Sequence, residues 1–434
     1  MIDTLKAAWR LPDLRKKLLF TIMMLIVFRF GSTIPVPGVS SLEKLVGDSS
    51  TLSLFGIMDL FSGGAFSQAT IFAMGISPYI NSSIIIQLLG VAIPALERLQ
   101  KEGEEGRKKI QSLTRIVTIA LAIIQGIGLY FLMNNYKLLT GGATFVGGFI
   151  VVTTLAAGTA FVMWIGEQIT DKGIGNGISL LIFTGIVARI PYIIQKVAKN
   201  YAISTEWYWI ALIVIYALGM IAFVVYFDSS ERRIPVQYSK RVVGRKMYGG
   251  QSSHIPLKVA MAGVLPIIFA ISILAFPTTI IQLFTGKTSA SDIATIHPFL
   301  GKVVEAFSSK SWVYALLYFL LIIAFTYFYT SITINPIEMA NNMKKNGGFI
   351  PGIRPGKPTS DFIGKSINKL NIAGSLFLSI VAIVPIIIGL FSSRFSSIGL
   401  LGGSSLLILV GVALETVKQI EAQLMMRHYK GFLE

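Results

Sequence analysis

The sequence predicts an all-α integral membrane protein with about ten transmembrane helices. Of its 434 residues, 53% are hydrophobic and only 14% are charged, and the mean hydropathy is +0.70, which is too apolar for an ordinary soluble domain. About ten apolar runs approach the roughly 20 residues that a helix needs to cross the hydrocarbon core. Basic residues gather in alternate connecting segments, as they do on the cytoplasmic side of membrane proteins.

Each apolar run is interpreted as one span. The runs lie at 18–34, 71–95, 113–133, 145–165, 178–194, 207–227, 263–284, 312–334, 372–391 and 400–420. The first run follows Lys16 and Lys17 as the core of a signal peptide would, but residues 32–41, "STIPVPGVSS", contain no convincing small-residue cleavage site. We therefore expect a retained first helix.

The placement of charge predicts the orientation. An even number of spans puts both termini on one side, and most of the 38 Lys and Arg residues fall in the segments on that side. These segments are 1–17, 96–115, 166–177, 228–258, 336–369 and 421–434. Both termini are therefore expected in the cytoplasm, and the net charge of +17 is explained first by topology and attraction to anionic membrane lipids.

Five spans before residue 200 and five after it divide the single membrane domain into two halves, 1–200 and 201–434. Because five is odd, the second half enters the membrane from the opposite side, as in inverted, pseudo-symmetric repeats with a functional site between them. The cytoplasmic loops of about 228–258 and 336–369 are longer than ordinary connectors, which indicates functional segments. Flexible loops that merely obey the charge rule remain the alternative.

The sequence predicts no enzyme and no cofactor. His254, His297 and His428 lie in separate segments outside the spans, the chain has no cysteine, and neither an HExxH nor a GxSxG motif is present. We identify no catalytic residue and no metal site. The stretches "GIGNG" at 173–177 and "GKS" at 364–366 lack the context of a phosphate-binding loop and are interpreted as flexible loops. An intramembrane enzyme is nearly excluded.

A secondary transporter for a small solute is the runner-up interpretation. Ion-coupled transporters usually carry ionisable side chains deep in their spans. Here Arg29 lies in the first span, where it either snorkels or pairs, and Glu415 lies near Lys418 toward the end of the last span. No span carries an acidic residue plainly at its centre, so the sequence supports ion coupling only weakly.

Eight stretches in colinear order cover nearly the whole chain: "IVFRFGSTIPVPG", "MDLFSGGA", "IFAMGISPYINSSIIIQLL", "KEGEEGRKKIQSLTR", "GEQITDKGIGNGIS", "QSSHIPLKVAMAGVLP", "NPIEMANNMKKNGGFIPGIRPG" and "GGSSLLILV". Together they closely resemble the bacterial SecY family, the main channel subunit of the Sec protein translocase. The resemblance implies a protein-conducting channel in the bacterial plasma membrane. Such a channel translocates unfolded secretory polypeptides across the membrane and releases hydrophobic segments laterally into it, and partner proteins supply the energy.

By this resemblance, residues 55–66 form a plug, a short helix that folds back into the outer funnel of the channel. The plug residues are Phe55, Gly56, Ile57, Met58, Asp59, Leu60, Phe61, Ser62, Gly63, Gly64, Ala65 and Phe66. Its glycine pair is a plausible hinge, because glycine tolerates the dihedral changes of a moving segment. The alternative is an amphipathic helix lying on the outer membrane surface.

The resemblance also implies a central constriction of bulky aliphatic side chains, the pore ring. It would consist of Ile76, Ile80, Ile178, Ile182, Ile268 and Ile408. An apolar constriction of this kind excludes water and ions by dewetting and offers no hydrogen bonds that would select among passing side chains. Taken alone, isoleucines four residues apart indicate only ordinary helix packing.

A lateral gate is implied between spans two and three on one side and spans seven and eight on the other. Gln87 and Gln125 would hold this seam shut by hydrogen bonds of about 1 kcal/mol each. Hydrogen bonds between helices that have no part in gating are the alternative. Family members often have asparagine where this chain has Ala260, so the polar contacts at the seam are weaker here or built differently.

The two long loops match those with which the family docks the ribosome or the SecA motor ATPase. The candidate contact residues are Arg232, Arg233, Lys240, Arg241, Arg245, Lys246 and Arg354. Arginine suits either partner, since it pairs with RNA phosphates and with carboxylates. The other partners that the resemblance implies are SecE-like and SecG-like small membrane subunits, signal peptides, nascent secretory chains and membrane lipids.

Overall fold

The structure is a computed structural model that describes residues 2–42, 54–140, 142, 144–202, 208–238, 241–243, 246–248, 252–285, 290–308, 311–391 and 403–430. The helices are α1 Ile2–Arg10, α2 Pro12–Gly31, α4 Leu54–Phe61, α5 Ser77–Ala92, α6 Pro94–Lys101, α7 Glu104–Asn135, α8 Phe145–Lys172, α9 Gly177–Ala202, α10 Tyr208–Asp228, α11 Leu265–Thr285, α12 Ala290–Ile296, α13 Pro298–Ala306, α14 Trp312–Thr333, α15 Pro336–Lys345, α16 Lys357–Phe391 and α17 Gly403–Lys430. The strands are β1 Glu231–Tyr238, β2 Arg241–Val243, β3 Lys246–Tyr248, β4 Ser252–Lys258 and β5 Gly348–Phe349.

All ten predicted spans coincide with long helices in the described part of the chain, which confirms an all-α membrane protein. Seven helices are long and apolar enough to cross a membrane by themselves, and the bent pair α5–α6 makes an eighth. The remaining predicted spans, the first and the fifth, correspond to α2 and to Gly177–Tyr192, the shorter apolar part of α9. The spanning helices carry apolar side chains on their outward faces. Ile215 of α10, for example, is 70% exposed, as expected for a side chain in contact with lipid.

The second span is shorter than predicted. Residues 71–76 form turns rather than helix, and Gly75 has a positive φ of 53°, which glycine tolerates best. Helix α5 then begins at Ser77 with Pro78 in its first turn, where the missing N–H of proline costs no hydrogen bond. It ends before Ile93, which is extended, and the chain turns by 107° into α6. The apolar run was identified correctly, but its helix is shorter than the run because residues 71–76 form turns and the helix ends at Ala92.

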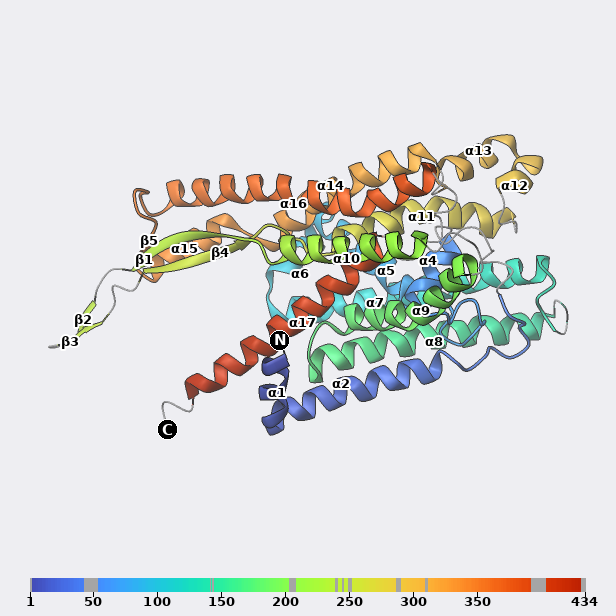
Figure 1. Cartoon of the computed structure of the whole chain (residues 1–434), viewed down its shortest axis with the longest axis horizontal. Coiled ribbons are helices and arrows are strands. Elements are labelled where there is room, and N and C mark those ends of the chain that lie inside the picture. Colours follow the sequence, from blue (N-terminus) through green and yellow to red (C-terminus); the bar gives the residue numbers. More distant parts are fainter. Residues whose placement is uncertain are drawn as a thin grey trace.

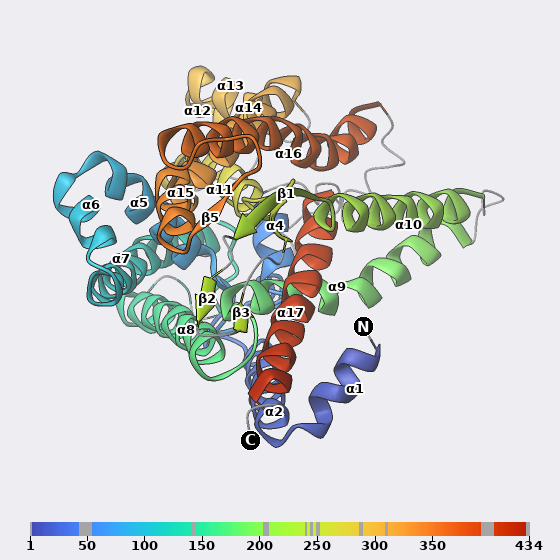
Figure 2. The same ribbon diagram turned by 90° about the vertical axis from the view of Figure 1, so that its left-hand side faces the viewer.

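The long helices form two groups that enclose the middle of the bundle. Helices α2, α5, α7, α8 and α9 pack in one group and α10, α11, α14, α16 and α17 in the other. On one side α11 contacts α5 and α7, and on the other side α9 contacts α10 and α17. Viewed along the helices, the short α4 lies near the middle of the bundle (Figure 2), where it contacts α9 and α11.

The glycine-rich segment between α8 and α9 joins elements of both groups. The backbone N–H of Ile174 donates to Thr21 Oγ1 of α2 at 3.1 Å, and that of Gly175 donates to Gln419 Oε1 of α17 at 2.9 Å. Gly175 has a φ of +89°, which favours glycine. The segment 173–177, interpreted from the sequence as a flexible loop, is therefore a cross-connection between α2, α9 and α17.

The two long loops are joined into one structure at the end of the bundle where the chain's C-terminal helix also projects (Figure 1). Strand β1 pairs with β4 over its length and with β5 at Gln237 and Tyr238, in the order β4-β1-β5. Alternate β1 residues, Ile234 and Val236, are buried in a cluster with residues of α15 and α16, as the two-residue period of a strand requires. Most of the predicted loop 336–369 is helical, because α16 begins at Lys357.

Two glycines in long helices differ in their surroundings: one is closely packed and the other faces open space. A Cβ on Gly158 of α8 would overlap the backbone carbonyl oxygen of Ile71, whereas a Cβ on Gly219 of α10 would meet nothing within 4 Å. We expect Gly158→Ala to lower the free energy of unfolding by about 1–3 kcal/mol through overpacking. Gly219→Ala should raise it by about 0.5–1 kcal/mol through helix propensity. Thermal unfolding of the purified protein in detergent tests both, and equal melting temperatures would contradict this account of the packing.

Candidate functional site

The six predicted pore-ring isoleucines all lie in the apolar core of the bundle. They belong to one hydrophobic cluster, five of them buried and Ile178 partly buried. The contributing elements are the turn before α5 (Ile76), α5 (Ile80), α9 (Ile178 and Ile182), α11 (Ile268) and α17 (Ile408). Both groups of helices therefore contribute to it.

Local geometry explains the pairs in this cluster. The N–H of Ile80 donates to the carbonyl oxygen of Ile76 at 3.0 Å, so the two side chains lie one helical turn apart on one face. Ile178 and Ile182 have the same spacing in α9. Branched aliphatic side chains that meet in this way close the space between helices without polar groups, and such a closure excludes water and ions.

The predicted plug segment is a short helix followed by tight turns. Helix α4 ends at Phe61, whose side chain belongs to the same cluster as the isoleucines. Phe66 is buried in a second cluster against α7 and α8. Gly63 and Gly64 have φ values of 68° and 92°, so the turn requires glycine there. The side chains of Phe55 and Ile57 lie outside the described part of the structure.

The turn after α4 is fixed by a buried acid, the plug residue Asp59, whose ion pair was not predicted from the sequence. Asp59 is fully buried; its Oδ1 accepts from the N–H of Ser67 at 2.8 Å, and its Oδ2 forms an ion pair with Arg189 of α9. Arg29 of α2 donates from Nη1 to the carbonyl oxygen of Gly63 at 3.1 Å. A signal was present in the sequence: one acid in an apolar short helix and one arginine in the fifth apolar run. Neither charge lies at the centre of a predicted span, which is where functional charges in membrane proteins are expected.

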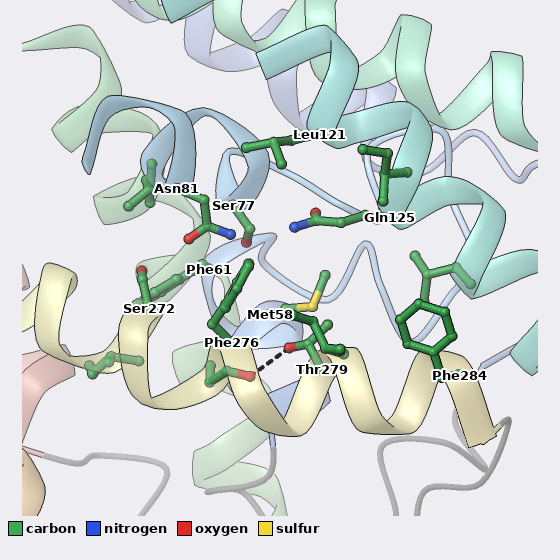
Figure 3. Close-up of a pocket in the computed structure, with 16 residues that line it drawn as sticks. Met58, Phe61, Ser77, Asn81, Leu121, Gln125, Ser272, Phe276, Thr279 and Phe284 are labelled. Atoms are coloured by element: carbon green, nitrogen blue, oxygen red, sulfur yellow. Dashed lines mark hydrogen bonds between the residues drawn. The ribbon is translucent and has the colours of Figure 1, made fainter. Parts of the chain in front are cut away.

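An apolar cavity of about 310 Å³ lies between α4, α5, α7 and α11 (Figure 3). Most of its lining is aliphatic or aromatic, including Phe61, Leu121 and Phe276. Its few polar groups come from α5, α7 and α11, and the amide of Gln125 points toward Ser77 and Asn81 across the cavity (Figure 3). The seam between the two groups of helices is therefore loosely filled rather than close-packed.

The two predicted gate glutamines are not brought together. Gln125 lines the apolar cavity, and its Oε1 is buried with no hydrogen-bond partner in the part of the chain that the structure describes. Gln87 donates from Nε2 to Ser83 Oγ within its own helix at 3.2 Å. It lines a second, larger and more polar cavity of about 1240 Å³, between α5, α6 and α7 and the segment 331–338. Ala260, the departure from the family asparagine, is buried just before α11.

The candidate docking residues lie at one end of the molecule. Arg232 and Arg233 are exposed on β1, where Arg233 Nε pairs with Glu231 Oε1 at 2.8 Å, and Arg354 is exposed in the turn before α16. Two further candidates, Arg241 and Lys246, lie in β2 and β3. The last two, Lys240 and Arg245, fall outside the described residues. Among the residues that are described, no group of three His, Asp or Glu side chains is arranged to hold a metal ion.

The unpartnered amide of Gln125 gives a stability test. Replacing a buried polar group that lacks a hydrogen bond by an apolar one of similar size should raise the free energy of unfolding, here by about 1 kcal/mol for Gln125→Leu. The matched control is Gln111→Leu in the same helix, because Gln111 donates to Glu167 Oε1 at 3.2 Å and its loss should be destabilising. Melting temperatures that shift in the same direction would contradict the assignment.

Known proteins share both the sequence and the fold. Residues 70–417 match the family model described as SecY. The protein translocase subunit SecY of Streptomyces galbus is 45% identical, over 100% of both chains. A solved structure described as a protein conducting channel has a TM-score of 0.64 at 18% identity and covers 94% of this chain and 92% of its own. Sec61 in the canine ribosome-channel complex from the endoplasmic reticulum has a TM-score of 0.61 at 18% identity, with the same coverages. The chain belongs to the SecY family of protein translocase subunits.

Proposed function

We propose that this chain is the channel subunit of a bacterial protein translocase. Unfolded secretory polypeptides cross the membrane between its two groups of helices, and hydrophobic segments leave sideways into the lipid. The chain is not an enzyme, and partner proteins supply the energy. The observation that carries the proposal is the single hydrophobic cluster that contains isoleucines from α5, α9, α11 and α17 together with Phe61 of α4.

This cluster seals the channel against water and ions and can be separated by a passing polypeptide. Apolar side chains that pack against one another keep water and ions out, and they regain much of their lost contact against any polypeptide that separates them. No fixed hydrogen bonds have to be broken, so the identity of the passing side chains matters little. The segment 55–66 lies against this cluster, which supports its role as a plug that leaves when a chain enters.

Lateral release is supported by the apolar cavity at the seam. A hydrophobic segment needs a lipid-like surface in order to leave an aqueous pore, and the wall formed by α5, α7 and α11 provides one. The contact between α11 and the pair α5 and α7 is the interface that has to open. Gln125 lies at this interface, whereas the larger polar cavity beside Gln87 suits the charged residues that flank such a segment.

We further propose the bacterial plasma membrane as the location, with both termini and the β4-β1-β5 sheet in the cytoplasm. The basic segments support this orientation. Exposed Arg232, Arg233 and Arg354 would dock the SecA motor ATPase or the ribosome, and SecE-like and SecG-like subunits would surround the bundle. Signal peptides and nascent chains enter from this side. The outward apolar surface contacts membrane lipids.

The channel is tested by crosslinking in this naturally cysteine-free chain. Single cysteines at Ile80, Ile182, Ile268 and Ile408 should each crosslink to a secretory polypeptide stalled during translocation. Leu155→Cys is the control, because Leu155 is fully buried in α8 outside the isoleucine cluster. Adducts at the four isoleucine positions and none at Leu155 support a path through the cluster. Adducts nowhere, or equally at Leu155, would contradict it.

The docking surface is tested by salt dependence. If arginines of the sheet and the adjoining turn contact ribosomal RNA, Arg232→Gln combined with Arg354→Gln should weaken ribosome binding and reduce the slope of log affinity against log salt by about 1 per lost contact. Lys302→Gln, at an exposed position of α13, is the control. Unchanged ribosome binding together with weaker SecA binding would identify the motor as the partner of these residues.

A further inference from the structure

We propose that Asp59 and Arg189 are positioning residues whose ion pair holds the plug segment in the closed channel. This inference rests on the proposed channel function and adds to it the contact that keeps the unoccupied channel shut. The Asp59 side chain is 0% exposed and the Arg189 side chain 15% exposed, so solvent screens their attraction only weakly.

Asp59 is built into the turn that ends the plug. Its Oδ1 accepts from the N–H of Ser67, while its carbonyl oxygen accepts from Gly64 N–H at 2.9 Å. One carboxylate therefore fixes the fold of the segment with one oxygen and ties it to α9 with the other. The plug cannot leave its position without separating this buried pair.

The same helix also fits the backbone of the plug. A Cβ on Gly185 of α9 would overlap the carbonyl oxygen of Phe61, and a Cβ on Gly63 would come within 2.9 Å of the Cα of Gly185. This close approach brings α4 near the foot of Arg189, one turn further along α9. Arg29 holds the opposite side through the carbonyl oxygen of Gly63. Two cations from α2 and α9 therefore hold one short segment.

The pair favours the closed state because the attraction between its two members is lost when the plug segment moves away from α9. When one partner of a buried ion pair is lost, the other remains a desolvated charge without compensation. When the plug moves into a water-filled pore, both charges regain hydration, so the pair holds the segment without making its release prohibitive. Neutralising either residue should therefore raise the population of the open, ion-permeable state in the absence of a polypeptide.

The test measures the ion conductance of the purified assembly, this chain with its co-purifying subunits, in planar bilayers without a translocating polypeptide. Asp59→Asn keeps an oxygen for the N–H of Ser67 and removes the charge, and it should raise the conductance about tenfold or more. Arg189→Gln should do the same, whereas Arg189→Lys, which keeps the charge, should stay closer to the wild type. Glu167→Gln is the matched control, since Glu167 is also buried and paired, with Arg115 at 2.7 Å, away from the plug.

The double variant distinguishes the ion pair from a merely structural role. If the residues act through each other, Asp59→Asn with Arg189→Gln should conduct no more than the more conductive single variant, because the second change removes a contact that is already broken. Effects that multiply, or conductances equal to that of the wild type, would overturn the proposal. If Asp59→Asn does not assemble, the comparison of Arg189→Gln with Arg189→Lys decides.

The same preparations separate this proposal from the channel function. Each is also tested for transport of a secretory polypeptide into vesicles with the motor ATPase added. A wild type that transports nothing contradicts the proposed function. Normal transport with unchanged conductance in Asp59→Asn and Arg189→Gln contradicts only the role of the ion pair.

Discussion

The structure depends on one constraint: its two groups of helices must meet through apolar contact at their centre and still be able to part. Hydrogen bonds across the centre would satisfy the first requirement but not the second, because separating them in a dry environment leaves unpaired polar groups. The cluster around Ile80, Ile182 and Ile408 avoids this cost. An ion pair between Asp59 of α4 and Arg189 of α9 lies at the flank of the cluster.

The remaining contacts between the two groups differ in kind on the two sides of the bundle. On the side of α9, α10 and α17, a hydrogen bond reaches across: the N–H of Gly175 donates to Gln419 Oε1 at 2.9 Å. On the side of α5, α7 and α11, the structure has an apolar cavity. Opening at the second side breaks few directional contacts, so the architecture favours movement there over movement at the first side.

Much of this arrangement was predictable from the sequence, because the length and apolarity of a run are local properties. Helices form along all ten runs, and the six isoleucines predicted from the SecY-like stretches lie in one large hydrophobic cluster. The boundaries were less predictable where local signals compete: residues 71–76 are apolar but are turned by Gly75, and α16 continues beyond its apolar part to Lys357. Residues outside the membrane can still favour a helix, so a helix such as α16 can extend beyond the apolar run that spans the membrane.

The polar contacts were the hardest to predict, because they depend on which segments the fold places side by side. Asp59 and Arg189 each stand out in the sequence as a charge in an apolar stretch. The residues around each of them in the sequence do not indicate that the two form an ion pair. Gln87 and Gln125 show the reverse case, in which two similar residues on adjacent helices were both predicted to hold the seam shut. The structure places them beside different cavities. Pattern alone does not fix the depth at which a side chain sits along a helix interface.

The three-stranded sheet has a mechanical consequence. Strand β1 continues directly from α10, β4 leads into α11, and β5 lies between α15 and α16, so one small sheet joins the ends of four helices. The buried side chains of Ile234, Val236 and Leu257 stiffen this junction against α16. A load applied to the sheet is therefore shared among these four helices, three of which, α10, α11 and α16, belong to the second group.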